Sequence, residues 1–160
     1  MPSPDEMLII VGIGEYATGT GAMAAIGLGS CIALALFDPV RGIGGMAHVM
    51  LPESQGRTGR PGKFADTAVD ILIGELRGVG CRNSSLSAKI AGGASMFRMS
   101  AASLNIGERN TVSVRAMLAE RRIPLLAEEV GGSVGRTVTF YPAEKGKMCI
   151  RIANGAIKEI

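Results

Sequence analysis

The sequence predicts a single α+β domain, residues 1–160, in which layered, mostly antiparallel or mixed β-sheets pack against two main helices. Short apolar runs of strand length recur along the chain between Gly- and Pro-rich turns, and two longer segments repeat apolar residues with helical spacing. Hydrophobic residues make up 47% of the chain and charged residues 19%, which supports one real core and excludes a disordered protein.

The N-terminal part of the chain predicts four strands and then a loop. The strands are expected at residues 7–11, 22–26, 31–37 and 43–51, and a polar, Gly/Pro-rich loop at 52–62. Asp38-Pro39-Val40-Arg41 separates the third strand from the fourth, with Asp and Pro at the positions that a β-turn favours. We therefore expect a two-residue turn at Pro39-Val40.

The rest of the chain predicts both helices and the closing strands. Helices are expected from Phe64 to the Gly78-Val79-Gly80 stop, and from Glu108 to about Arg122. Further strands are expected at 88–91, 124–130, 137–141 and 148–152. The total is about seven or eight strands and two helices.

Composition argues against nucleic acid and membrane partners. The net charge is +3, but the basic residues are scattered, and aromatic residues are only 4% with no tryptophan. Residues 16–37 are uncharged and long enough to span a bilayer, but four glycines divide them into strand-sized pieces. We expect no nucleic-acid binding and no membrane insertion.

The three cysteines, Cys31, Cys81 and Cys149, are an odd number spread over the chain, so a disulfide framework is not expected and a reducing, cytoplasmic compartment fits. With the single histidine they show no metal-ligand spacing. Residues 12–17 match the dinucleotide fingerprint G-x-G-x-x-A, but Gly19 and Gly21 disfavour the helix that must follow, so a plain turn is predicted.

Cys31 and His48 are the candidate catalytic pair. The turn at Pro39-Val40 would place Cys31 directly opposite His48 on one face of the hairpin. A histidine beside a cysteine generates a thiolate near neutral pH, and the tight turn 27–30 could gather backbone N–H groups around an oxyanion. The alternative is a buried structural cysteine and a hydrogen-bonded core histidine.

Six segments, in order, resemble the chemoreceptor glutamine deamidase family, CheD. They are Leu28-Gly29-Ser30-Cys31, residues 45–52 (GMAHVMLP), 61–68 (PGKFADTA), 88–97 (AKIAGGASMF), 106–110 (IGERN) and 127–132 (AEEVGG). The resemblance covers nearly the whole chain from Ile9 to Arg151.

The resemblance implies a cysteine-hydrolase, deamidase-like fold with Cys31 as nucleophile and His48 as base. It also implies that glutamines on the cytoplasmic helices of chemoreceptors become glutamates, that a CheC-type phosphatase is a partner, and that neither a metal nor an organic cofactor is needed.

The chain departs from the family at Ala25, where a threonine commonly completes the catalytic set. Alanine cannot orient an imidazole. Either a backbone carbonyl or another polar side chain holds His48, or the protein deamidates slowly and acts mainly as a binding module for a phosphatase or receptor. We expect that restoring the hydroxyl, by Ala25→Thr, raises the deamidation rate, and an unchanged rate would mean that another group already orients His48.

Overall fold

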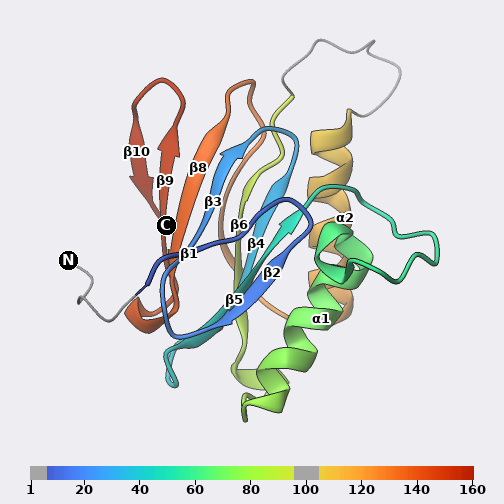
Figure 1. The fold of residues 1–160 in the computed structure, drawn as a ribbon, viewed down its shortest axis with the longest axis vertical. Coiled ribbons are helices and arrows are strands. Elements are labelled where there is room, and N and C mark those ends of the chain that lie inside the picture. The colour runs from blue at the N-terminus through green and yellow to red at the C-terminus, as the bar shows by residue number, and fades with distance from the viewer. Residues whose placement is uncertain (1–6, 96–104) are drawn as a thin grey trace.

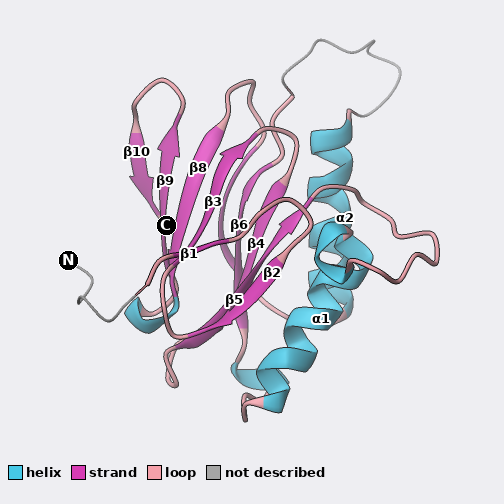
Figure 2. Cartoon of the chain, viewed as in Figure 1, coloured by secondary structure: helices cyan, strands magenta, loops and turns pink. Residues whose placement is uncertain are grey.

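The computed structural model describes residues 7–95 and 105–160. Figure 1 shows three layers: an outer sheet, a central sheet, and two helices that cover the free face of the central sheet. In Figure 2 both long helices lie on one side of the strands. The predicted α+β class, with mixed sheets and two main helices, is confirmed.

The central sheet carries the hairpin that holds both candidate residues. Its strand order is β2 (Tyr16–Gly19), β5 (Ile43–Val49), β4 (Ile32–Asp38), β6 (Ser87–Gly92) and β7 (Leu125–Val130). Neighbouring strands are antiparallel except β6 and β7, which are parallel because the helix α2 (Ile106–Glu120) connects them.

The outer sheet is built from both ends of the chain. Its order is β1 (Ile9–Ile10), β3 (Met23–Leu28), β8 (Arg136–Tyr141), β9 (Lys147–Ile152) and β10 (Ile157–Glu159). β1 runs parallel to β3, and the other neighbours are antiparallel. A bulge interrupts β3 between Ala25 and Leu28, where Gly27 has a φ of 67°.

The helices are α1 (Ala65–Gly78) and α2 (Ile106–Glu120). The side chain of Asn105 caps α2 by accepting a hydrogen bond from the Glu108 N–H at 2.9 Å. Short 3-10 helices lie at Pro61–Lys63, Asn83–Ser85 and Pro142–Glu144.

β4 lies between two hydrophobic cores and contributes alternate residues to each. Ile32, Leu34 and Leu36 pack with the helices, whereas Ala33, Ala35 and Phe37 pack against the outer sheet. Every residue of β4 is buried. This explains why the strand reads as a continuous apolar run rather than an alternating one.

The predicted two-residue turn at Pro39-Val40 is wrong. Asp38 pairs with Ile43, so four residues form the loop and Asp38 Oδ1 accepts hydrogen bonds from the Val40 and Arg41 N–H groups. Two-residue hairpins favour positive φ in the turn, which proline cannot adopt. The loop instead closes at Gly42, where φ is 68°.

Residues 7–95 and 105–160 form ten strands rather than seven or eight, because β2 and β10 were not predicted. The first strand has only two residues, Ile9–Ile10, where five were expected. The predicted plain turn at the start of residues 12–17 is confirmed, and β2 rather than a helix follows it. The uncharged segment 16–37 forms β2, β3 and most of β4. Within residues 7–95 and 105–160, no helix is both long enough and apolar enough to cross a membrane.

Candidate active site

Cys31 lies immediately before β4, in a segment that the end of β6 holds in place. The Gly93 N–H donates to the Cys31 carbonyl and the Ala94 N–H to the Gly29 carbonyl, both at 2.9 Å. The Cys31 side chain is half-buried and packs against the core between the two sheets. The thiol therefore points toward the outer sheet rather than toward the helices.

Glycines allow the backbone behind Cys31 to pack this closely. A Cβ at Gly92 would collide with the Cys31 carbonyl oxygen, and Gly92 has a φ of 113°. A Cβ at Gly107 would lie 2.7 Å from the Gly93 carbonyl oxygen, so α2 also abuts this backbone. Residues 88–97 and 106–110, two of the segments that carry the family resemblance, thus support the backbone at Cys31.

His48 is buried on β5, and its ring is held by a backbone carbonyl. Nδ1 of His48 lies 3.0 Å from the carbonyl oxygen of Val11. A carbonyl oxygen only accepts hydrogen bonds, so this contact requires the proton to be on Nδ1 and leaves Nε2 as the basic nitrogen of the neutral ring.

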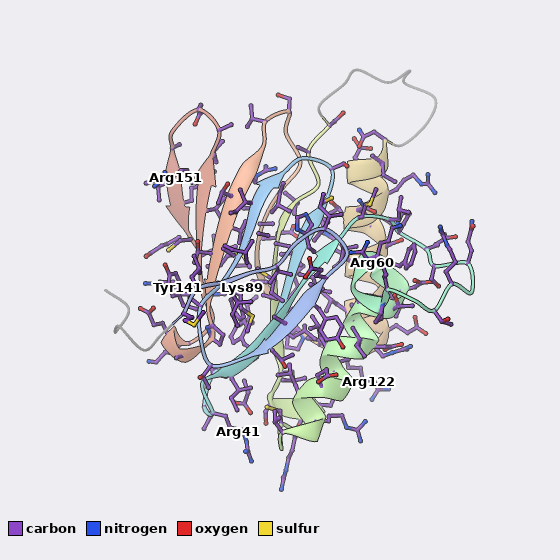
Figure 3. All side chains as sticks on the ribbon, in the orientation of Figure 1. Arg41, Arg60, Lys89, Arg122, Tyr141 and Arg151 are labelled. Atoms are coloured by element: carbon purple, nitrogen blue, oxygen red, sulfur yellow. The ribbon has the colours of Figure 1, made fainter. Side chains whose placement is uncertain are left out.

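Residues 12–17, which match the dinucleotide fingerprint, hold the backbone of His48 through hydrogen bonds. The Gly14 N–H donates to the His48 carbonyl at 2.9 Å, and the His48 N–H donates to the Glu15 carbonyl at 3.0 Å. In Figure 3, Arg60 lies on the loop that precedes α1, and its guanidinium donates to the Ile13 carbonyl at 2.8 Å. Nothing in the sequence pattern indicated that this turn holds the histidine.

Cys31 does not lie directly opposite His48, so the expected register is wrong. The expectation that both side chains share one face of the hairpin agrees with the strand pairing. Ala33 lies opposite His48. Since Cys31 is two residues before Ala33, the side-chain period of two returns it to the same face. Such diagonal neighbours have Cα atoms roughly 7–8 Å apart, with Cβ atoms somewhat closer. The two-residue shift keeps the thiol and the imidazole on the face that meets the outer sheet.

Burial sets the resting state of the Cys31 thiol. It raises the pKa of this thiol above its ordinary value, because a thiolate loses solvation there. A raised pKa favours the protonated thiol of Cys31, whereas the sequence interpretation expected a thiolate beside a histidine.

Backbone donors lie next to the thiol. Within residues 7–95 and 105–160, the N–H groups of Ser30 and Cys31 donate no hydrogen bond to another residue. A substrate oxygen beside Cys31 therefore has donors that no other group of the described chain occupies.

Ala25 is fully buried in β3, within the core between the sheets. It pairs with Val138 of β8 and has no polar atom in its side chain. Of the alternatives that the sequence left open for holding His48, the structure contains the backbone carbonyl, supplied by Val11.

Asn110 is the polar residue at this site to which sequence reasoning gave no role. It lies on α2, is completely buried, and donates from Nδ2 to the carbonyl oxygens of Ser30 and Met50, both at 3.0 Å. Its position in the segment 106–110 was the only signal in the sequence.

The other two cysteines lie elsewhere. Cys81 is buried in the core beneath the helices, and Cys149 is on β9 in the outer sheet. Within the described part of the chain, no cluster of three or more His, Cys, Asp or Glu side chains is arranged to bind a metal ion.

Comparison with known proteins gives a consistent set of relatives. Residues 50–152 match the family model described as CheD chemotactic sensory transduction. The chain is 48% identical over 157 residues to the chemoreceptor glutamine deamidase CheD of Thermotoga maritima, an alignment that covers 94% of this chain and 98% of that one.

More distant relatives carry a similar name. Proteins named probable chemoreceptor glutamine deamidase CheD, from Clostridium kluyveri and Archaeoglobus fulgidus, are 45% and 42% identical. These alignments cover 95% and 92% of this chain, and 97% and 94% of theirs. Among solved structures, the Bacillus licheniformis hypothetical protein YfiH has a TM-score of 0.46 at 14% identity and covers 71% of this chain and 49% of its own.

Proposed function

The chain belongs to the CheD family, and on that premise we propose that it is a protein-glutamine deamidase that acts on chemoreceptors in the cytoplasm. The reaction hydrolyses the side-chain amide of selected glutamines on the receptor's cytoplasmic helices, releasing ammonia and leaving glutamate. Each turnover adds one negative charge to a receptor helix, which is how the modification shifts a signalling equilibrium.

The chemistry proceeds through a thioester on Cys31. Nε2 of His48 takes the thiol proton as sulfur attacks the amide carbon, so a resting thiol with a raised pKa is compatible with general-base activation. The free N–H groups of Ser30 and Cys31 stabilise the oxyanion. The carbon–nitrogen bond then breaks, and the imidazolium proton leaves with ammonia.

Water completes the cycle. Nε2 of His48, again neutral, removes a proton from water as it attacks the thioester carbonyl. The carbon–sulfur bond breaks, sulfur recovers the proton, and the product is a glutamate side chain. The overall balance is amide plus water to carboxylate plus ammonium, with no redox change.

One observation carries this proposal: the thiol of Cys31 and a histidine with its Nδ1 held by the Val11 carbonyl share one face of the β4–β5 hairpin. In a neutral ring, this contact leaves Nε2 unprotonated and available as the base. The deamidase names of relatives that align over more than nine-tenths of the chain agree with it.

The test is to incubate cytoplasmic fragments of chemoreceptors with the purified protein and to map glutamine-to-glutamate conversion by mass spectrometry. Conversion at specific glutamines, with equimolar ammonia, is the expected result. Conversion by Cys31→Ala protein at the wild-type rate would refute the assignment of the nucleophile.

A binding module is the second candidate function, and Ala25 favours it, because a site without the family threonine could have lost its activity. In that case the partner is a CheC-type phosphatase or the receptor itself. Receptor fragments would then remain unmodified while the phosphatase bound equally well to wild-type and Cys31→Ala protein. The same binding assay tests the phosphatase as a partner of an active deamidase.

A further inference from the structure

Asn110 is placed to act on the peptide group that the chemistry uses. The carbonyl of Ser30 and the N–H of Cys31 belong to one peptide unit, which is planar and trans. The side chain of Asn110 donates to this carbonyl at 3.0 Å. Fixing the carbonyl end fixes the direction of the N–H, which points to the opposite side of the same plane.

The second donor hydrogen of the Asn110 amide holds the backbone that follows His48. Nδ2 of Asn110 also donates to the Met50 carbonyl at 3.0 Å, two residues after His48. One side chain from α2 thus joins the segment before the nucleophile to the end of the strand that carries the base. Both of its donor hydrogens are used.

The side chain of Asn110 has one further polar atom besides the nitrogen that donates. Its Oδ1 is buried and has no hydrogen-bond partner among residues 7–95 and 105–160. A buried acceptor without a partner is destabilising, so the value of Asn110 at this position lies in the two hydrogen bonds that it donates, which an apolar residue of similar size could not make.

We propose that Asn110 is a positioning residue for the oxyanion site: it holds the Ser30–Cys31 peptide so that the Cys31 N–H faces the substrate carbonyl oxygen. The hydrogen bond to the carbonyl also polarises the peptide and strengthens its N–H as a donor. This inference rests on the proposed use of Cys31 as the nucleophile.

Two reactions of the same thiol separate this role from general support of the fold. Acetylation of Cys31 by p-nitrophenyl acetate passes through a tetrahedral oxyanion, whereas alkylation by iodoacetamide displaces iodide at a saturated carbon and forms none. The ratio of the two rates cancels any change in the thiolate fraction. The experiment uses the full chain with Cys149→Ser, and mass spectrometry confirms that Cys31 is the modified residue.

In Asn110→Ala protein we expect acetylation to fall by about tenfold to a hundredfold, while alkylation stays within about twofold of the parent. Asn110→Leu refills the space with an apolar side chain and gives the same result if the alanine variant does not fold. Asn83→Ala is the matched control, because Asn83 also donates from Nδ2 to a carbonyl, that of Arg121 at 3.3 Å, at the other end of α2. It leaves the ratio unchanged.

Equal losses of acetylation and alkylation, or no loss of either, would overturn the proposal. If neither variant folds, the test uses the wild-type protein. An aldehyde forms a hemithioacetal with the thiol, and we expect the NMR resonance of the Cys31 backbone amide to shift. A resonance that does not shift overturns the inference. A protein that shows the ratio change but modifies no receptor retains the role of Asn110 and loses the proposed function. If the protein deamidates receptors but the ratio is unchanged, the proposed function stands and the role of Asn110 is refuted.

Discussion

The carbonyl oxygen of Val11 lies 3.0 Å from Nδ1 of His48, and this contact joins the two sheets at the candidate active site. His48 belongs to β5 of the central sheet, whereas Val11 continues β1 in the outer sheet through a 2.7 Å hydrogen bond from its N–H to the Ala24 carbonyl. The orientation of the His48 ring therefore depends on the backbone at position 11 and not on the side chain of Val11.

Restoring a threonine at position 25 gives no gain in rate once Val11 holds the imidazole. The sequence alone favoured an increase, but Ala25 is fully buried between the sheets, so the larger polar side chain is expected to cost about 1–3 kcal/mol of stability. Urea unfolding of Ala25→Thr measures that cost, and receptor deamidation measures the rate. A faster, equally stable variant would show that Val11 does not suffice.

Cys31→Ala abolishes receptor deamidation and leaves the fold intact, because the side chain is small and only half-buried. Circular dichroism checks the fold, and mass spectrometry of receptor fragments checks the activity. Cys149→Ala, on the outer sheet, is the control and retains the wild-type rate. Activity that survives in Cys31→Ala protein and disappears in Cys149→Ala protein would place the reactive thiol on β9.

Alkylation of Cys31 by iodoacetamide becomes faster as pH rises, with a midpoint above the value of about 8.5 for a free cysteine. Burial raises the pKa of this thiol, so the reactive thiolate appears only at higher pH. Rates measured from pH 6 to pH 10 in Cys149→Ser protein test the direction. A midpoint below that of a free cysteine would instead indicate a preformed ion pair with His48.

Gly92→Ala disrupts the nucleophile segment, because the new Cβ meets the Cys31 carbonyl oxygen at a backbone φ of 113°. We expect destabilisation of at least about 2 kcal/mol together with loss of activity. Gly74→Ala is the matched control: it is an exposed position within α1 where a Cβ meets nothing within 4 Å, so it stabilises the protein by about 0.5–1 kcal/mol. Equal effects of the two substitutions on unfolding would contradict this account.

The apolar runs and the helical periodicity predicted both helices and most strands. These elements bury one or both of their faces in the core, and buried faces leave a regular apolar pattern in the sequence. β2 and β10 escaped prediction because they are short and partly or fully exposed, without a clear apolar pattern. Cys31 and His48 were predicted as a pair from the expected hairpin register and from the family resemblance. Val11 acts through its backbone, and Asn110 joins segments 60 and 80 residues away, so neither contribution leaves a local pattern.

The hydrogen bond between His48 and Val11 joins the two sheets, so we expect the candidate site to be complete only late in folding. Val11 is hydrogen-bonded to β3 through the Ala24 carbonyl, and β3 pairs on its other side with β8. Because of this pairing, we expect the Val11 carbonyl to be held firmly only after the strands from residue 136 onward have joined the outer sheet. We therefore expect a chain that lacks its last strands to contain Cys31 and His48 without holding the His48 ring in place. During refolding from urea, deamidation activity should recover later than the helical circular dichroism signal. A partly folded chain would then modify no receptor.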